Sequence, residues 1–246
     1  MINLLSSSFF SLAKGNERTN QDSCLPPVKV SNGYLFAIAD GLGGYRGGKE
    51  ASQLVIEHLF SSFLNDQSID LEILFNSLKN DVMTLSITDK GFVNAATTLT
   101  FCYINNEQLT IGHIGDCRLF YKNESKLIQL TKDHTQKQEL LDQGVFTKKQ
   151  LENAVIKNIL TTAISKTLEL KFDIKKIPIS EVSDSSGFIN LYLMSDGAHH
   201  FWEKRPRFSL NTLIEPSKFC SSLKRRIESG PPIDDYSLIS ILLKSQ

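Results

Sequence analysis

Seven short runs of β-branched, aromatic and other apolar residues recur along the chain, and this pattern constrains its fold more than any other. Runs of this length and composition, bounded by turn residues, are typical of β-strands. The chain is therefore expected to be built around β-sheet. The predicted strands cover residues 34–39, 97–104, 108–114, 118–122, 168–177, 189–194 and 237–243.

Helical spacing of apolar residues marks four further segments, namely residues 49–64, 71–85, 134–143 and 210–227. In the first of them Ala51, Val55 and Leu59 fall on one face, which is wide enough to cover a sheet. Helices that flank many strands predict an α+β fold. Asn105 and Asn106 mark a hairpin turn between two strands and a third strand follows directly, so the middle of the chain is expected to form an antiparallel meander.

Composition narrows the class of protein. The chain has 246 residues, 27 Lys and Arg against 27 Asp and Glu, and 41% hydrophobic residues, as expected of a globular protein. Its balanced charge lacks the basic footprint of a nucleic-acid binder or a polybasic membrane binder. No Gly/Ser-rich or single-sign stretch is long enough to be a linker, so residues 1–246 are predicted to form one domain.

The sequence has neither a membrane-spanning segment nor a cysteine motif. No apolar stretch approaches the ~18 residues needed to cross a bilayer, and the apolar segment at residues 2–12 has no charged region ahead of it. A cytoplasmic location is therefore expected. The cysteines form no CxxC pair or Cys/His cluster, so neither a zinc site nor a disulfide framework is predicted for Cys24, Cys102, Cys117 and Cys220.

Aspartates occur where predicted strands begin or end. Asp40 and Asp196 each come just after a predicted strand, and each is followed at once by a glycine. Asp116 comes just after another strand, and Asp234 with Asp235 stands just before the last one. A single aspartate in such a position is usually a turn former, but four instances in one chain indicate a shared function.

Strands that converge in one sheet system would bring these carboxylates to a common edge. Like charges there repel strongly unless cations neutralise them. Carboxylates, a backbone carbonyl and waters suit Mg²⁺ or Mn²⁺, whereas a zinc site normally recruits His or Cys. The sequence therefore predicts a centre of hard metal ions, and it indicates no organic cofactor.

A glycine-dense stretch at residues 41–50 follows a predicted strand and opens a predicted helix, as phosphate-binding loops do. Gly43, Gly48 and Lys49 fit the pattern G-x-x-x-x-G-K, but Glu50 stands where a hydroxyl would have to bind Mg²⁺. The chain also lacks the alternating β-α-β-α pattern that P-loop proteins need. Nucleotide binding through this stretch is therefore the less favoured alternative.

The aspartates belong to longer motifs that follow one another along residues 15–243. These are Asn20-Gln21-Asp22-Ser23, Asp40-Gly41-Leu42-Gly43-Gly44, Ala96-Thr97-Thr98, Gly115-Asp116-Cys117-Arg118, Leu130-Thr131-Lys132-Asp133-His134-Thr135, Ser195-Asp196-Gly197 and Asp234-Asp235-Tyr236-Ser237. Their order and spacing resemble the metal-dependent Ser/Thr protein phosphatases of the protein phosphatase 2C type. Leu42 stands where many eukaryotic members carry His, so the chain resembles the bacterial branch.

The resemblance implies a four-layer αββα sandwich, in which two mainly antiparallel β-sheets are flanked by helix pairs, with a two-metal centre at one edge. Asp40 would bridge the two ions, and Gly41 would lend its carbonyl to one of them. Asp196 and Asp234 would ligate the other ion. Asp116 would hold the third ion seen in bacterial members.

The implied activity is hydrolysis of phosphoserine and phosphothreonine by a metal-activated water that attacks phosphorus directly, with no phosphoenzyme. Asp22 would hold a metal-bound water, since Gln21 replaces the Glu often found beside it. Arg18 is the candidate phosphate ligand, with a surface arginine as the alternative, because it lies four rather than five residues before Asp22. His199 and His200 are interpreted as exposed loop residues without a catalytic role.

The resemblance also implies partners, namely a phosphorylated protein substrate and a cognate Ser/Thr kinase that the enzyme opposes in bacterial signalling. We expect a monomer without nucleic-acid or membrane partners. Residues 137–165 resemble the flap beside the active site of bacterial members. Their lysines would suit a phosphopeptide, and a solvated face is an equal alternative. The alternative is a catalytically weak, phosphatase-like binding or regulatory module, and the presence of all four metal aspartates argues against it.

Overall fold

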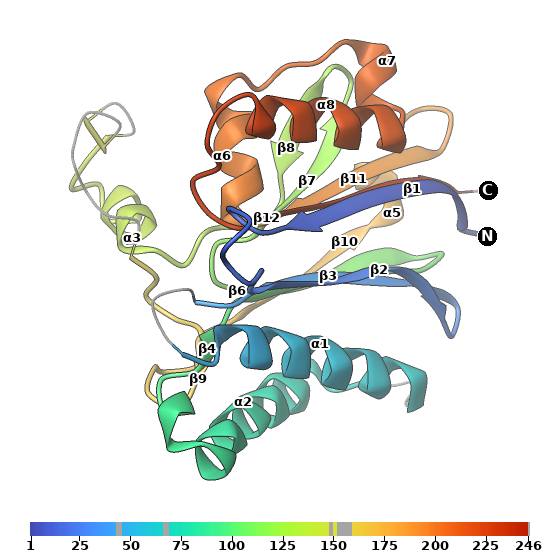
Figure 1. The fold of residues 1–246 in the computed structure, drawn as a ribbon. Helices are drawn as coiled ribbons and strands as arrows, with labels where there is room; N and C mark the ends of the chain where they lie inside the picture. Colours follow the sequence, from blue (N-terminus) through green and yellow to red (C-terminus); the bar gives the residue numbers. More distant parts are fainter. Residues whose placement is uncertain (43–45, 66–68, 148–149, 152–158, 246) are drawn as a thin grey trace.

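The computed structural model describes residues 1–42, 46–65, 69–147, 150–151 and 159–245. Two five-stranded sheets lie face to face at its centre and share one apolar core, and helices cover the outer face of each sheet (Figure 1). The layers therefore run helices, sheet, sheet, helices. This arrangement confirms the predicted α+β class and the four-layer sandwich.

Neighbouring strands are antiparallel throughout both sheets. The first sheet has the order β1 (Asn3–Leu12), β12 (Tyr236–Lys244), β11 (Phe188–Met194), β7 (Arg118–Asn123) and β8 (Lys126–Gln129). The second sheet has the order β10 (Asp173–Pro178), β6 (Gln108–Ile114), β5 (Leu99–Ile104), β3 (Gly33–Asp40) and β2 (Asp22–Val30). A short additional pair joins β4 (Ala96–Thr97) to β9 (Ile164–Ser165).

The helices that pack on the sheets lie in two groups, one on each side (Figure 1). The second sheet is covered by α1 (Gly48–Asn65) and α2 (Leu71–Thr88), and the first by α6 (Asp196–Lys204), α7 (Leu210–Leu213) and α8 (Pro216–Glu228). Further helices lie in the connections, namely η1 (Lys90–Phe92), α3 (Gln136–Asp142) and α5 (Ile179–Val182). Within the described residues, none of the helices is long and apolar enough to cross a membrane.

Strands that are buried on both faces explain the continuous apolar runs in the sequence. On β3, Phe36 and Ile38 belong to the core between the sheets, while Leu35 and Ala37 pack in the layer formed with α1 and α2. All four side chains are fully buried. Because successive strand residues face opposite sides, burial on both sides removes the alternation of polar and apolar residues.

The predicted meander is wrong beyond its first turn. β5 and β6 form the expected hairpin, in which the Asn105 side chain accepts hydrogen bonds from the backbone N–H groups of Glu107 and Gln108. The next strand, β7, pairs with β11 and β8 in the other sheet. Gly115 turns the chain out of the sheet with a φ of +109°, and a side chain there would collide with Thr98.

The strand predicted over residues 168–177 begins only at Asp173, so its first half was misassigned. Leu170 and Phe172 pack instead in the layer of α1 and α2, where Phe172 stacks on Phe75 with 4.3 Å between ring centroids. Packing under a helix, rather than pairing in a sheet, accounts for their apolar character.

The helix predicted over residues 210–227 is two helices, α7 and α8. Pro216 begins α8. Because proline lacks a backbone N–H and its ring clashes with the preceding turn, it is tolerated at the start of a helix but not in its interior. The break therefore falls where this proline stands.

Candidate metal centre

Asp40 is the last residue of β3, and two threonines hold its backbone. Its N–H donates a hydrogen bond to Thr98 Oγ1 at 3.0 Å. Its carbonyl accepts from the Thr97 hydroxyl at 3.0 Å and from the Thr98 N–H at 2.8 Å. The Ala96-Thr97-Thr98 motif thus fixes the strand end that presents the Asp40 carboxylate.

Gly41 continues this strand end through a space too narrow for a side chain. Its N–H donates to the Gln21 carbonyl at 3.2 Å, and a Cβ at this position would lie 2.3 Å from the Gly48 carbonyl oxygen. Ser52 ties α1 to the same point by donating to the Gln21 carbonyl at 2.6 Å. Glycine is required here because both the start of β2 and the start of α1 approach the backbone closely.

Asp22 is the first residue of β2 and lies opposite Asp40 in the strand register. Its side chain is buried, and its Oδ2 accepts hydrogen bonds from the hydroxyls of Ser195 at 2.8 Å and Ser237 at 2.6 Å. Among the described residues, none forms a hydrogen bond with its Oδ1. Burial raises the pKa of Asp22 to about 7, although the two serine hydrogen bonds act to lower it.

Asp196 is the first residue of α6, and Asp234 lies in the segment that leads into β12. These elements meet closely, because a Cβ at Gly197 would lie 2.0 Å from the Asp235 carbonyl oxygen. The Asp235 carboxylate holds its own segment by accepting two backbone N–H groups of the β1–β2 connection, each at 2.8 Å. Burial raises the pKa of Asp196, and the Asp234 charge raises it further.

Asp116 lies in the turn between β6 and β7 and is buried. Its backbone carbonyl accepts a hydrogen bond from His199 Nε2 on α6 at 3.2 Å. Burial raises the pKa of its carboxyl group, and Asp196 is the neighbouring charge that adds most to this rise. Asp116 and Asp196 therefore lie close enough for their charges to interact, although one lies between β6 and β7 and the other follows β11.

The pKa of Asp40 reflects the charges of the whole cluster. Loss of solvent raises the pKa of its carboxyl group well above the usual range, and four other carboxylates raise it further, those of Asp22, Asp196, Asp116 and Asp234. All five lie at a strand end or strand start or within two residues of one. The structure thus brings together the aspartates that the sequence motifs single out.

The cluster fits hard divalent cations. Crowded carboxylates favour binding of protons or metal ions, since either relieves their mutual repulsion. The carboxylates, the Asp22 Oδ1 atom and the Gly41 carbonyl offer oxygen donors alone, which suits Mg²⁺ or Mn²⁺. No three His, Cys, Asp or Glu side chains in the described part of the chain already form a ligand group for one ion, so the assignment of ligands to ions is a proposal.

Arg18 lies at the rim of the carboxylate cluster. Its Nη2 is 3.1 Å from Asp234 Oδ1 and 3.5 Å from Asp235 Oδ2, and it donates to Gln21 Oε1 at 3.3 Å. The side chain is 34% exposed, so an anion in solution has access to it. Its place beside the aspartates is what a phosphate-binding role requires.

The interpretation of His199 as an exposed loop residue is wrong. The residues from Asp196 onward form a helix rather than a loop, and His199 is only 4% exposed on it. Sequence reasoning also missed the contacts of Ser195 and Ser237 with Asp22. These contacts join parts of the chain that are far apart in sequence, so no local pattern predicts them. The available signal is that both serines belong to the motifs shared with the family.

Two predicted features fall partly outside the described residues. They are the glycine-dense stretch, at residues 43–45, and the flap-like segment, at residues 148–149 and 152–158. The described part of the flap-like segment includes α3, which stands off the sandwich (Figure 1). The Thr135 hydroxyl caps α3 by accepting a hydrogen bond from the Gln138 N–H at 3.2 Å.

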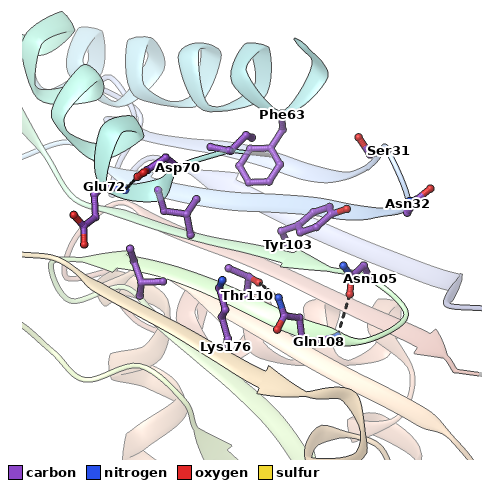
Figure 2. A pocket seen from close by; sticks show the side chains of 13 residues that line it. Ser31, Asn32, Phe63, Asp70, Glu72, Tyr103, Asn105, Gln108, Thr110 and Lys176 are labelled. Atoms are coloured by element: carbon purple, nitrogen blue, oxygen red, sulfur yellow. Dashed lines mark hydrogen bonds between the residues drawn. The ribbon is translucent and has the colours of Figure 1, made fainter. Parts of the chain in front are cut away.

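A hollow of about 840 Å³ lies elsewhere, on the outer face of the second sheet beside the start of α2 (Figure 2). Tyr103, Thr110 and Lys176 line it from the strands, and Phe63 and Glu72 line it from the helices. The residues of the carboxylate cluster do not contribute to its lining. This hollow is therefore separate from the candidate metal centre.

Known proteins similar to this chain define its family. The sequence profile of protein phosphatase 2C matches residues 13–232. Protein phosphatase PhpP of Streptococcus pneumoniae is 28% identical over 188 residues, which cover 72% of this chain and 76% of PhpP. Serine/threonine phosphatase stp of Listeria monocytogenes is 28% identical over 174 residues, which cover 68% of this chain and 67% of stp.

Solved structures share the fold. Stp1 from Staphylococcus aureus superposes with a TM-score of 0.80 at 19% identity, covering 97% of this chain and 95% of Stp1. The catalytic domain of PstP, solved with two manganese ions, gives a TM-score of 0.74 at 22% identity and covers 100% of both chains.

A carboxylate cluster at one end of an αββα sandwich has the chemistry of a protein that binds hard metal ions through oxygen ligands. The profile match is more specific, and the chain belongs to the protein phosphatase 2C family. The predicted family and the predicted enzyme class, a serine/threonine protein phosphatase that depends on metal ions, are thereby confirmed.

Proposed function

We propose that the carboxylate cluster is the active site, where the chain removes phosphate from phosphoserine and phosphothreonine of protein substrates and opposes a Ser/Thr kinase in bacterial signalling. One observation carries this proposal. Asp40 lies within electrostatic reach of four other carboxylates, which come from separate segments. Such crowding is unfavourable for folding unless cations bind there, so a metal-binding function accounts for it best.

The assignment of ligands follows the motifs. Asp40 would bridge two ions, the Gly41 carbonyl would bind one of them, and Asp196 and Asp234 would bind the other, with Asp116 on a third. Either Mg²⁺ or Mn²⁺ suits these oxygen donors. Divalent cations at such a site supply an activated water and neutralise the charge on the phosphoryl oxygens.

Two side chains of the cluster would act on water and substrate. Ser195 and Ser237 fix Oδ2 of Asp22, which leaves Oδ1 to accept a hydrogen bond from a water in the site. Arg18 would bind a phosphoryl oxygen, because its planar guanidinium group can donate two parallel hydrogen bonds. A substrate phosphate would then compete with Asp234 for the Arg18 side chain.

The organisation of the molecule extends this proposal. Residues 1–246 would act as one catalytic domain, as a monomer in the cytoplasm. Within the flap-like segment, α3 would contact the phosphopeptide, since segments that stand off a rigid scaffold commonly select substrates.

A substrate panel tests the proposed function. Phosphate release by the purified chain with Mn²⁺ is measured with phosphoserine, phosphothreonine and phosphotyrosine peptides and with ATP. We expect release from the first two peptides, and the same rates for the Lys49→Ala variant. Release from ATP alone, lost in Lys49→Ala, would instead support the nucleotide-binding alternative. A folded chain that binds Mn²⁺ and hydrolyses none of them would favour the binding-module alternative.

Arg18→Ala is expected to raise KM for a phosphothreonine peptide about 10–100-fold and to lower kcat less. A hydrogen bond to a charged group is commonly worth about 1.5–3 kcal/mol, which corresponds to that range. Arg18→Lys keeps the charge without the planar fork, so an intermediate KM is expected. Steady-state kinetics of the three proteins measures this effect, and an unchanged KM in Arg18→Ala would support the surface-arginine alternative.

Asp116→Ala is expected to leave two tightly bound ions in place and to slow turnover by about tenfold or more, as loss of one electrostatic contact to a transition state commonly does. The measurement is kcat as a function of Mn²⁺ concentration, alongside bound Mn²⁺ per chain. If the variant matched the wild type at every Mn²⁺ concentration, Asp116 would have no third-ion role.

A further inference from the structure

Helix α6 carries a stripe of three polar residues. Asp196, His199 and Glu203 are spaced by three and then four positions, so they lie on one face of the helix. Asp196 belongs to the carboxylate cluster, whereas the other two have no part in the proposed chemistry. Both nevertheless contact the segment that carries Asp116.

His199 makes the first contact, through a buried hydrogen bond. Its Nε2 lies 3.2 Å from the Asp116 carbonyl oxygen. A carbonyl oxygen can only accept, so Nε2 is the donor. Its Nδ1 lies 3.8 Å from Glu203 Oε2, and no described residue forms a hydrogen bond with that nitrogen. The ring is thus oriented by its hydrogen bond to the Asp116 carbonyl.

Arg118 makes the second contact, two residues after Asp116. Its Nη1 donates to Glu203 on α6. Its Nε and Nη2 donate to the buried Asp133 carboxylate at 2.8 and 2.6 Å. Because a bidentate pair fixes the plane of the guanidinium group, Arg118 is held from both sides. The turn that carries Asp116 is therefore tied to α6 at two points.

These ties bear on the metal centre because Asp116 and Asp196 come from elements that are far apart in the sequence. Helix α6 carries Asp196 and also holds the Asp116 turn, so it contributes to the spacing of the two carboxylates. Residues that orient metal ligands in this way commonly change metal affinity 10–100-fold when they are removed.

We propose that His199 and Glu203 are positioning residues, which hold the turn that carries Asp116 against α6 and so fix the place of the Asp116 carboxylate in the cluster. The inference rests on the proposed function, in which Asp116 binds the third and weakest ion. It assigns a role to two residues that touch neither the substrate nor the ions.

Mn²⁺ binding, followed by equilibrium dialysis or calorimetry, tests the inference directly. His199→Leu removes the donor, while His199→Gln can place an amide N–H near the position of Nε2. His200→Leu is the matched control, because the adjacent His200 ring packs on Phe201 instead. We expect the weakest Mn²⁺ class to lose affinity about 10–100-fold in His199→Leu, to recover in His199→Gln and to stay unchanged in His200→Leu, with the tight ions unaffected throughout.

Glu203→Gln tests the same tie without disturbing the core, since the Glu203 side chain is 52% exposed. It keeps the shape of the side chain and removes the charge that attracts Arg118. We expect a weaker but selective loss of affinity in the same Mn²⁺ class. This variant decides the question if His199→Leu does not fold.

The outcomes separate this inference from the proposed function. Unchanged affinity of the weakest Mn²⁺ class in folded His199→Leu and in Glu203→Gln would overturn the inference. Loss of the tightly bound ions in both His199→Leu and His199→Gln would also overturn it. A wild-type chain that binds only two ions yet hydrolyses phosphopeptides would overturn the inference and leave the proposed function standing. A chain that shows the predicted binding pattern without hydrolysis would support the positioning role and overturn the proposed function.

Discussion

The Asp40→Asn variant is expected to lose at least about a thousandfold in kcat/KM for a phosphothreonine peptide while remaining folded, a loss of about 4 kcal/mol in transition-state stabilisation. A neutral amide is a poor bridge between two cations, so the metal centre would not assemble. Folding should survive because the asparagine is nearly the same size. The variant also removes a carboxyl group whose pKa is raised by loss of solvent and by Asp22, Asp196, Asp116 and Asp234.

Phosphate release measures the first part of this prediction, and the melting temperature in EDTA measures the second. Asp70→Asn is the matched control, because Asp70 caps α2 on the surface and asparagine caps a helix equally well. Its activity should equal that of the wild type. Wild-type turnover in Asp40→Asn would refute the site assignment, and a lower melting temperature in EDTA would refute the electrostatic account of the cluster.

Without metal ions, the melting temperature of the chain is expected to fall by several degrees as pH rises from about 6.5 to 8. The pKa of Asp22 is raised by burial from 3.8 to about 7, and burial raises the pKa of Asp40 and Asp116 as well. A raised carboxyl pKa gives stability that is fully present below the unfolded value and is lost as pH rises through the folded value. Each kcal/mol lost lowers the melting temperature of a chain this size by about 2–4 °C.

His113 acts in the opposite direction but in a different pH range. Burial lowers its pKa to about 4, so its contribution to stability grows with pH only up to the unfolded value of about 6.5. Above that pH the aspartates dominate the pH dependence of stability.

Saturating Mn²⁺ should abolish the decline, because cations bind the ionised carboxylates more tightly as pH rises. The measurement is a set of melting curves between pH 6.5 and 8 in EDTA and in Mn²⁺. A melting temperature in EDTA that stays level or rises over this range would contradict the account. A rise in melting temperature on adding Mn²⁺ that is equally large at every pH would contradict it too.

Burial decided which parts of the fold could be predicted from sequence. Strands such as β3 and β11, buried on both faces, read as continuous apolar runs and were found. β1 was missed because serines occupy much of its half-exposed length. No strand is predicted over β2, whose apolar run is interrupted by Pro26 and Pro27; these residues lie where the β2–β3 register shifts on an edge strand. Proline is tolerated at such edges and bulges.

The same limit applies to the site. Asp40, Asp116 and Asp196 follow strands that periodicity predicts, so their convergence could be anticipated. Asp22 begins a strand that was not predicted, and only the resemblance to a known family pointed to it. The spacing of His199 and Glu203 after Asp196 becomes meaningful only once these residues are known to form a helix that packs on the Asp116 turn.

The most direct test of the central claim is a Mn²⁺ titration of the metal-free chain in which bound Mn²⁺ per chain and release of phosphate from a phosphothreonine peptide are recorded on the same samples. The account predicts no release at zero bound ions and a rise in rate as the tight sites fill. Full release by a chain that binds no Mn²⁺ would contradict it.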